Sequence, residues 1–303
     1  MFLEEGLPRS IVVAVSRRNH RAKPRSSANA SGGIVALGKF DALHLGHREL
    51  AFQASKAGAP FLLSFVGMAE VLGWEPRAPV VAKCDRKRVL SSWTPYCGDL
   101  TPGELHVEFS SVRQLSPRQF VEKLSTELGV RGVVTGENYR FGYKAAGDTK
   151  QLIELCEEYG MGAYIVSSVM DKNQLIENRG PTNTKENGQV SSTRVRHALA
   201  EGDMKYVSEL LGRKHRLMLS RQGEIKSEGN KLSAPKSSLL NLSPKEGLYG
   251  NCSVLVDNTV LLHSCKVMID ATHIYVESDN DAASIHDLFI QDWEQIGIEF
   301  GDT

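Results

Sequence analysis

The sequence predicts an α/β protein built on a doubly wound parallel sheet, with a smaller β-rich domain toward the C-terminus. Three observations lead to this fold class. Short apolar runs alternate with segments of helical periodicity between residues 34 and 166, which is the pattern of parallel βαβ units. A glycine-containing turn follows the first apolar run, and from about residue 215 the alternation gives way to β-like runs.

The predicted elements of the first part follow one another at the spacing of a parallel sheet. Ser116 and Pro117 form a helix start, and Gly129 ends that helix. The strands are expected at residues 34–37, 61–66, 132–135 and 164–166, the helices at 47–57, 85–93, 116–128, 149–159 and 193–201, and a polar loop at 171–189.

The C-terminal part has a different pattern, because a polar stretch at residues 221–244 is followed by β-like runs. Antiparallel β structure with a closing helix fits this order better than further βαβ units. The β-like runs lie at residues 248–256, 260–269 and 273–277, and the helix-like segment lies near 285–293. We therefore expect a leader at 1–30, a larger α/β domain at 31–214 and a β domain at 215–303.

The composition excludes several classes of protein. The 36 basic residues balance the 36 acidic ones, so no net field would recruit nucleic acid or an anionic membrane. No apolar run approaches the roughly 18 to 20 residues of a membrane-spanning helix. The five cysteines form no CxxC or Cys/His spacing, so neither a disulfide framework nor a zinc site is predicted. We expect small-molecule substrates, with no nucleic-acid and no membrane partner.

The leader has the composition of an organelle transit peptide. Residues 7–30 contain six Arg or Lys residues among several serines and no acidic residue, although Glu4 and Glu5 precede them. The alternative is a disordered tail without a targeting role.

The turn after the first predicted strand carries the chemistry. His44 and His47 lie between this strand and the next helix, where free backbone N–H groups and the helix dipole attract anions. Gly38 and Gly46 allow the backbone to approach a ligand closely. Two imidazoles there can donate hydrogen bonds to a phosphoryl group as its charge builds. The alternative is a pair of ordinary turn histidines, but the series of strand, glycine turn, paired histidines and helix favours a phosphate site.

The stretch GKFDALHLGH resembles the GxFDxxHxGH motif of the nucleotidyltransferase superfamily, whose fold is Rossmann-like. A second stretch, SSTRVR, is similar to the SSTxxR element of that superfamily, although serine at a helix start is also explained by simple capping. The resemblance implies that His44, His47 and Arg196 are catalytic. It implies an ATP site made by Gly38, Phe40, Asp41, His44, Gly46, His47, Ser191, Ser192, Thr193 and Arg196.

A third segment narrows the substrate. Residues 136–148, GENYRFGYKAAGD, resemble the G[DE]NFRFGxxxxGD segment of the prokaryotic-type FAD synthetases, and the resemblance as a whole covers about residues 33–214. It implies an FMN site that includes Asn138, Arg140, Phe141 and Asp148. Without the resemblance, Asn138 and Asp148 are turn and helix-cap residues.

Two segments depart from the bacterial pattern. Residues 64–74 replace the usual TFxPHP run with a form typical of plant plastid FAD synthetases, so flavin contacts there cannot be carried over. The C-terminal part resembles a degenerate riboflavin kinase barrel, in which Lys236, Ser237 and Ser238 stand where the kinase motif has its metal-binding and nucleotide-binding threonine and asparagine.

The resemblance therefore implies an FMN adenylyltransferase that uses Mg²⁺, acts on FMN and ATP, lacks riboflavin kinase activity and resides in the plastid stroma after its leader is cleaved. No metal ligand and no oligomeric state are assigned. The alternatives are a bifunctional kinase and adenylyltransferase, or a flavin-nucleotide sensor without catalysis.

Overall fold

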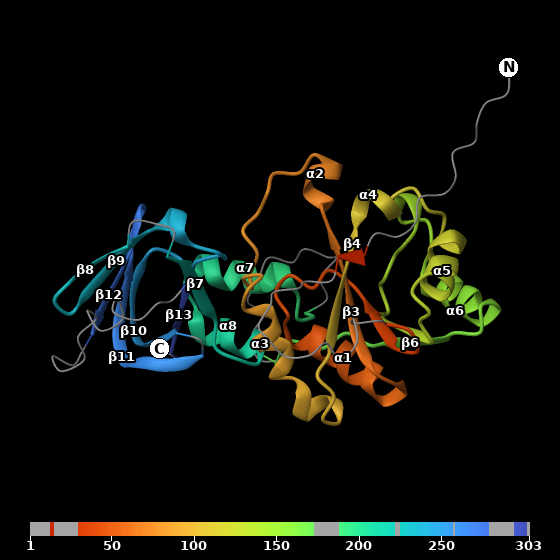
Figure 1. Ribbon diagram of the computed structural model, residues 1–303, viewed down its shortest axis with the longest axis horizontal. Coiled ribbons are helices and arrows are strands. Elements are labelled where there is room, and N and C mark those ends of the chain that lie inside the picture. The colour runs from red at the N-terminus through yellow and green to blue at the C-terminus, as the bar shows by residue number, and fades with distance from the viewer. Residues whose placement is uncertain are drawn as a thin grey trace, which may run out of the picture. The chain divides into compact units, whose positions relative to one another are not determined.

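The computed structural model describes residues 13–14, 30–172, 188–221, 225–256, 258–278 and 294–301. The chain divides into two compact units (Figure 1). Unit 1 comprises Met1–Phe40, His47–Pro76 and Arg88–Ser168, and unit 2 comprises Asp41–Gly46, Arg77–Lys87 and Val169–Thr303.

Unit 1 contains a six-stranded sheet in the order β1-β4-β3-β2-β5-β6. Strands β2 to β6 are parallel, and only the short edge strand β1 is antiparallel to its neighbour β4. The order of the five parallel strands reverses between β2 and β5, as in a doubly wound fold, so the predicted fold class is confirmed. The strands are β1 (Val13–Ala14), β2 (Ile34–Leu37), β3 (Pro60–Val66), β4 (Gly103–Glu108), β5 (Gly132–Gly136) and β6 (Gly162–Val166).

Strand β4 is not among the strands predicted from the sequence. Its residues alternate between the acidic or imidazole side chains of Glu104, His106 and Glu108 and the buried Leu105 and Val107. This alternation is the signal of a strand with one face in the core, so the sequence does contain the information for β4.

Local sequence explains where the helices of this part begin. Ser116 accepts a hydrogen bond from the N–H of Gln119, whose side chain in turn accepts one from the N–H of Ser116, and this capping box with Pro117 starts α5. The helices are α1 (Leu45–Ala57), α2 (Met68–Leu72), α3 (Arg86–Ser91), α4 (Phe109–Val112), α5 (Pro117–Thr126) and α6 (Thr149–Glu158), with 3₁₀ turns η1 (Thr94–Cys97) and η2 (Tyr143–Ala145). No helix in the described part of the chain is long and apolar enough to cross a membrane.

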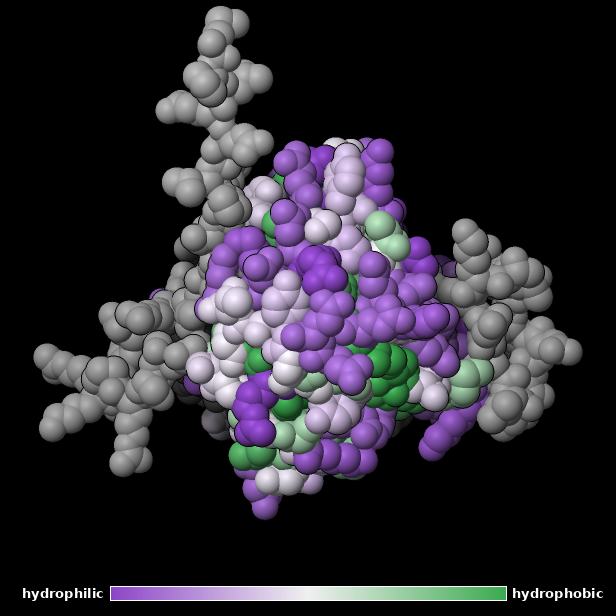
Figure 2. Space-filling model, turned by 90° about the vertical axis from the view of Figure 1, so that its right-hand side faces the viewer, coloured by the Kyte–Doolittle hydropathy of each residue, from purple (hydrophilic) through white to green (hydrophobic). Residues whose placement is uncertain are grey.

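The core of unit 1 lies between the parallel sheet and the amphipathic helices. Leu63 and Leu105 from the strands pack with Leu124 of α5 and Leu152 of α6, and all four are fully buried. Figure 2 views the molecule from the side of α5 and α6 and shows hydrophilic side chains over most of this face, with apolar ones between them. The helices therefore bury one apolar stripe each and leave a polar face to water.

Unit 2 contains a seven-stranded antiparallel sheet in the order β7-β13-β10-β11-β12-β9-β8, and Figure 1 shows that it curls. The three predicted β-like runs are confirmed as β10, β11 and β12, while the predicted helix near 285–293 and most of the 171–189 loop lie outside the described residues. The strands are β7 (Arg216–Ser220), β8 (Lys226–Glu228), β9 (Lys231–Pro235), β10 (Gly247–Val256), β11 (Thr259–Ile269), β12 (His273–Ser278) and β13 (Gln295–Glu299).

The compact units do not divide at residue 214, where the sequence predicts the domain boundary. Helices α7 (Ser192–Glu201) and α8 (Met204–Leu211) belong to unit 2, because their buried side chains share one core with the antiparallel sheet. Leu199 and Leu210 of these helices and Val254 and Ile298 of the sheet are all nearly inaccessible to solvent. Periodicity shows which helix face is apolar but not which sheet that face covers, so the sequence does not indicate that α7 and α8 share the core of the antiparallel sheet.

Candidate active site

The turn between β2 and α1 contains a strained residue. Leu43 has φ 48° and is fully buried, although the left-handed region is unfavourable for a bulky side chain. The guanidinium of Arg213 holds this turn, since Nη1 donates to the Leu43 carbonyl at 2.6 Å and Nη2 donates to the Ala42 carbonyl at 2.9 Å. A residue 170 positions away thus fixes the backbone directly before His44.

His44 is a buried and neutral histidine. Its side chain is 6% exposed, and burial, with a smaller effect of the positive charge of Arg213, lowers the pKa of His44 to about 3. The neutral ring still has one N–H group to donate. Gly46 leaves room for this ring, because a Cβ atom at position 46 would lie 3.1 Å from His44 Cε1.

His47 lies in the first turn of α1, where backbone N–H groups have no partner inside the helix. Its ring is 8% exposed and packs edge-on against Phe40, with 4.9 Å between the ring centroids. The predicted residue Phe40 is therefore a buried support for the orientation of His47.

In unit 2 the fold brings Asp41 and Arg196 together across 155 residues of sequence. Arg196 Nη2 donates to Asp41 Oδ2 at 2.7 Å, and Nε donates to the same oxygen at 3.2 Å. Arg196 also donates to the Ala78 carbonyl at 2.8 Å, and the Val80 N–H donates to Asp41 Oδ1 at 3.0 Å. This network fixes the orientation of the Arg196 guanidinium near the N-terminal end of α7.

The start of α7 is a capped helix terminus. The Ser191 side chain accepts a hydrogen bond from the Arg194 N–H, so Ser191 is the N-cap. Ser192 and Thr193 are the first two helical residues, and Thr193 is exposed. Their N–H groups lie at the positive end of the helix dipole, which suits an anion.

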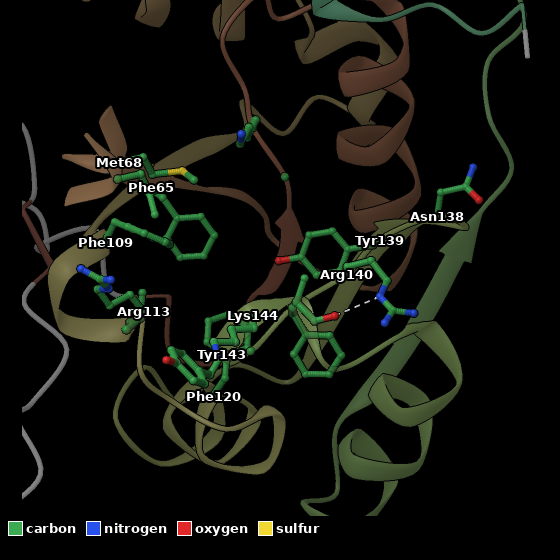
Figure 3. A pocket seen from close by; sticks show the side chains of 17 residues that line it. Phe65, Met68, Phe109, Arg113, Phe120, Asn138, Tyr139, Arg140, Tyr143 and Lys144 are labelled. Carbon is green, nitrogen blue, oxygen red and sulfur yellow. Dashed lines mark hydrogen bonds between the residues drawn. The ribbon is translucent and has the colours of Figure 1, made fainter. Parts of the chain in front are cut away.

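Unit 1 contains a cavity of about 650 Å³, a size typical of small-molecule sites. It lies at the carboxyl ends of the parallel strands, where doubly wound folds bind ligands, with residues contributed after β2, β3, β4 and β5. Its lining is rich in aromatic rings, several of which Figure 3 shows around it. The aromatic residues are Phe65, Phe109, Phe120, Tyr139, Phe141 and Tyr143.

The predicted FMN residues differ in their positions. Asn138, Arg140 and Phe141 line the cavity, but the Phe141 ring is also part of the core of unit 1. Asp148 is not among the lining residues, and its carboxylate caps α6 by accepting a hydrogen bond from the Gln151 N–H at 2.9 Å.

Arg140 holds its own loop. Its Nε donates to the Ala145 carbonyl at 3.1 Å and Nη2 donates to the Ala146 carbonyl at 3.4 Å, one of which is the dashed contact in Figure 3. This loop needs such support because Lys144 and Ala145 have φ values of 53° and 56°.

Several residues at these sites are not among the site residues predicted from the sequence. Arg213 is recognisable only in space, since nothing in its sequence position indicates which backbone it holds. The lining residues Met68, Phe109 and Tyr139 follow predicted or overlooked strands, so their position after a strand end is a signal that could have identified them. Lys39 lies inside the predicted motif, between Gly38 and Phe40, and lines the cavity as well.

Comparisons with known proteins show which family the chain belongs to. A family model described as FAD synthetase matches residues 105–179, and another, described as the C-terminal domain of FAD synthetase 1/2, matches residues 214–303. The Arabidopsis thaliana protein named FAD synthetase 1, chloroplastic, is 58% identical over 274 residues, which cover 89% of this chain and 77% of that protein. The chain belongs to the FAD synthetase family.

Other members of the FAD synthetase family extend the comparison. FAD synthetase 2, chloroplastic, of Arabidopsis thaliana is 59% identical over 271 residues, covering 89% of this chain and 73% of that protein. The bifunctional riboflavin kinase/FMN adenylyltransferase of Listeria monocytogenes is 30% identical over 190 residues, covering 59% of this chain and 53% of that protein. As a member of this family the chain is an enzyme, a nucleotidyltransferase, as its motifs predict.

A solved structure shares the fold. The protein from Streptococcus pneumoniae named a macrolide-efflux protein superposes with a TM-score of 0.66 at 19% identity, covering 89% of this chain and 84% of that chain. At this identity the likeness shows the fold alone, a parallel α/β domain followed by a β domain.

Proposed function

We propose that the chain transfers the adenylyl group of ATP to FMN, giving FAD and pyrophosphate, and that it does not phosphorylate riboflavin. The observation that carries this proposal is the turn that begins at Gly38. Gly38 and Lys39 line an aromatic cavity large enough for a flavin ring, and the two motif histidines follow in the same turn of the chain.

In this reaction an FMN phosphate oxygen forms a bond to the α-phosphorus of ATP, and the bond between that phosphorus and the bridging oxygen to the β-phosphate breaks. No covalent enzyme intermediate is needed, so positioning and electrostatics carry the catalysis. His44 and His47 would donate hydrogen bonds to the transferring group. Ser192, Thr193 and Arg196 would hold the β- and γ-phosphates at the N-terminus of α7.

Mg²⁺ remains a proposal. Among the described residues no three His, Cys, Asp or Glu side chains are grouped so that they could hold a metal ion. Mg²⁺ commonly binds proteins through one or two carboxylates together with substrate phosphates, so this chain would receive it mainly with ATP. It would neutralise polyphosphate charge there.

The lack of kinase activity rests on the segment at the end of β9. Lys236 begins η4 (Lys236–Ser238) and pairs with Glu246 at 3.2 Å. Ser238 is buried, and its hydroxyl donates to the Pro235 carbonyl at 2.7 Å. A lysine has no lone pair for a metal at neutral pH and repels it, and the Ser238 hydroxyl already has a local partner. The competing proposal is a bifunctional enzyme, as the name of the Listeria monocytogenes relative states for that protein.

One assay separates these functions. Purified chain is incubated with ATP and Mg²⁺ and with either FMN or riboflavin, and the flavins are resolved by chromatography. We expect FAD from FMN and no FMN from riboflavin. Steady FMN formation from riboflavin would establish the bifunctional alternative, and flavin binding without any FAD would establish the sensor.

We also propose that the chain resides in the plastid stroma and that residues 1–30 form a cleavable leader. The support is the basic leader composition and the chloroplastic names of the two Arabidopsis relatives. Apart from Val13–Ala14, residues 1–29 lie outside the described residues. A fluorescent fusion of residues 1–60 should enter plastids, whereas a diffuse cytosolic signal would contradict this proposal.

A further inference from the structure

The cavity of unit 1 has to distinguish two flavins that share the same ring system. An apolar, aromatic lining binds the ring of riboflavin and the ring of FMN alike, because the two molecules differ only in a phosphate. A cation placed where the phosphate lies favours FMN on that difference. The positively charged residues of the cavity lining are Lys39, Arg113, Arg140 and Lys144.

Three of these cations have positions that favour other roles. Arg140 donates to the Ala145 and Ala146 carbonyls of its own loop. Arg113 donates to the Val71 carbonyl at 3.4 Å, which connects it to α2. The Lys144 Nζ atom lies 5.4 Å from the ring centroid of its neighbour Tyr143, and Lys144 itself has a positive φ in the loop that Arg140 holds.

Lys39 has the position that a phosphate receptor needs. It lies two residues after the carboxyl end of β2 and five residues before His44, inside the motif that carries the predicted chemistry. Its side chain is exposed, and its ammonium nitrogen lies over the ring of Trp74, 4.9 Å from the centroid. A flavin phosphate bound by Lys39 would therefore be held by a residue that is close along the chain to the histidines proposed to act on the α-phosphate that it attacks.

Trp74 contacts the Lys39 ammonium without itself lining the cavity. It follows α2, whose Met68 and Leu72 line the cavity although no residue of α2 is buried. The indole is itself 53% exposed, and a cation–π contact at an exposed site is weak. A weak contact of this kind can orient the lysine and can be exchanged for an ion pair with a doubly charged phosphate.

We propose that Lys39, positioned by Trp74, binds the phosphate of the flavin and makes this cavity select FMN over riboflavin. The inference rests on the proposed adenylyl transfer to FMN. The reaction converts a phosphate monoester, which carries nearly two negative charges, into a diphosphate in which the same group carries one. Lys39 therefore holds the substrate more strongly than the product.

The test is equilibrium binding of FMN and of riboflavin, followed by flavin fluorescence without ATP. Lys39→Met should weaken FMN binding about ten- to hundredfold, which is the loss of one hydrogen bond to a charged group, and should leave riboflavin binding within about twofold. Lys39→Arg should keep most of the preference for FMN. The matched control is Lys56→Met, which removes a similar contact, over Phe52 at 4.1 Å, from a lysine outside the cavity lining.

A second pair of variants tests the role of Trp74. Trp74→Phe keeps an aromatic face and should keep the preference for FMN, whereas Trp74→Leu should reduce it. In FAD formation from FMN and ATP, Lys39→Met should raise KM for FMN far more than it lowers kcat, because Lys39 binds a group that is present before the reaction.

Three outcomes would contradict either the role of Lys39 or the proposed function. If Lys39→Met weakens riboflavin and FMN binding equally, Lys39 only supports the wall of the cavity and the inference is wrong. Unchanged FMN binding in Lys39→Met and Lys39→Gln would also overturn it. An unaltered chain that binds neither flavin and forms no FAD would instead refute the proposed function.

Discussion

At the scale of single residues, burial sets the chemistry of His44. Its pKa of about 3 means that the ring is neutral throughout the physiological range. In the proposed reaction it would therefore stabilise a phosphoryl group as a neutral hydrogen-bond donor and not as a cation. A cation buried at this position would carry a large desolvation cost whenever no substrate is bound. A neutral donor carries a much smaller one. The pH dependence of turnover between pH 6 and 8 should therefore not report His44.

The first prediction concerns stability against pH. Burial also lowers the pKa of His215 to about 4, so both histidines take up protons mainly in the unfolded chain between those values and the ordinary value of 6.5. The free energy of unfolding should thus fall as the pH decreases from about 6.5, by up to about 1.4 kcal/mol per pH unit for each histidine. Urea unfolding of the native chain and of His215→Gln from pH 7 to 5 measures this, and an unchanged slope in the variant contradicts it.

The second prediction concerns His47. If its ring contacts charge that appears mainly in the transition state, His47→Ala should lower kcat about 10² to 10³-fold and change FMN binding little. Phe40, against which the ring packs, supplies the control, since Phe40→Leu keeps the histidine but loosens its orientation and should have an intermediate effect. Near-normal turnover of His47→Ala would leave His47 an ordinary turn residue.

The third prediction concerns Arg213, which acts through the backbone. Arg213→Met removes the donors to the Ala42 and Leu43 carbonyls, and Leu43 then lacks the contacts that offset its unfavourable φ. We expect a loss of turnover of more than about tenfold together with a lower thermal midpoint. Arg118→Met, at an exposed ion pair with Glu158, is the control and should change neither. Wild-type behaviour of Arg213→Met would show that the turn is held in another way.

At the scale of elements, Asp148 has two candidate roles: it caps α6, and the family resemblance implies that it binds flavin. The carboxylate caps α6, so Asp148→Ala should destabilise the fold by about 1 kcal/mol, while Asp148→Asn keeps most of the cap. If capping is its whole role, FMN affinity at low temperature stays unchanged in both variants. A loss of affinity in Asp148→Asn, with stability retained, would support the flavin role that the family resemblance implies.

The accuracy of the element predictions depends on how local the signal is. Helix α5 was predictable because Ser116, Pro117 and the apolar spacing all lie within one segment. Strands β8 and β9 were hidden in the polar stretch at residues 221–244, since both are short and carry charged residues such as Lys226 and Lys231. Strand β8 is also an edge strand, where charged residues are common. The pairing of β9 with β12 depends on residues about forty positions later, which no local pattern can show.

At the scale of the whole molecule, unit 2 indicates a structural role for the β domain that does not depend on kinase activity. The side chains of α8 that are buried against the antiparallel sheet are Met204, Val207, Leu210 and Leu211. Exposing each of them costs about 1.5–3 kcal/mol, and the sum is comparable to the 5–15 kcal/mol that stabilises a typical domain. The sheet therefore stabilises the helix pair whose first turn carries the predicted phosphate residues.

A truncation tests this structural role. The chain ending at residue 214 should be poorly soluble or should lose FAD formation, although it contains every residue predicted to bind ATP and FMN. Leu210→Ala in the full chain serves as a graded comparison, with an expected loss of about 2–5 kcal/mol in unfolding free energy. A soluble truncated chain with full activity would contradict the shared core.

The sequence by itself determined the parallel sheet, the turn with the paired histidines, the helix caps and the family, because each of these depends on residues that are close together along the chain. Only the tertiary structure decided that Asp41 pairs with Arg196, that Arg213 holds the turn before His44, and that α7 and α8 share the core of the β domain. These facts depend on which distant segments meet when apolar surface is buried, and burial is a property of the folded chain and not of any local pattern.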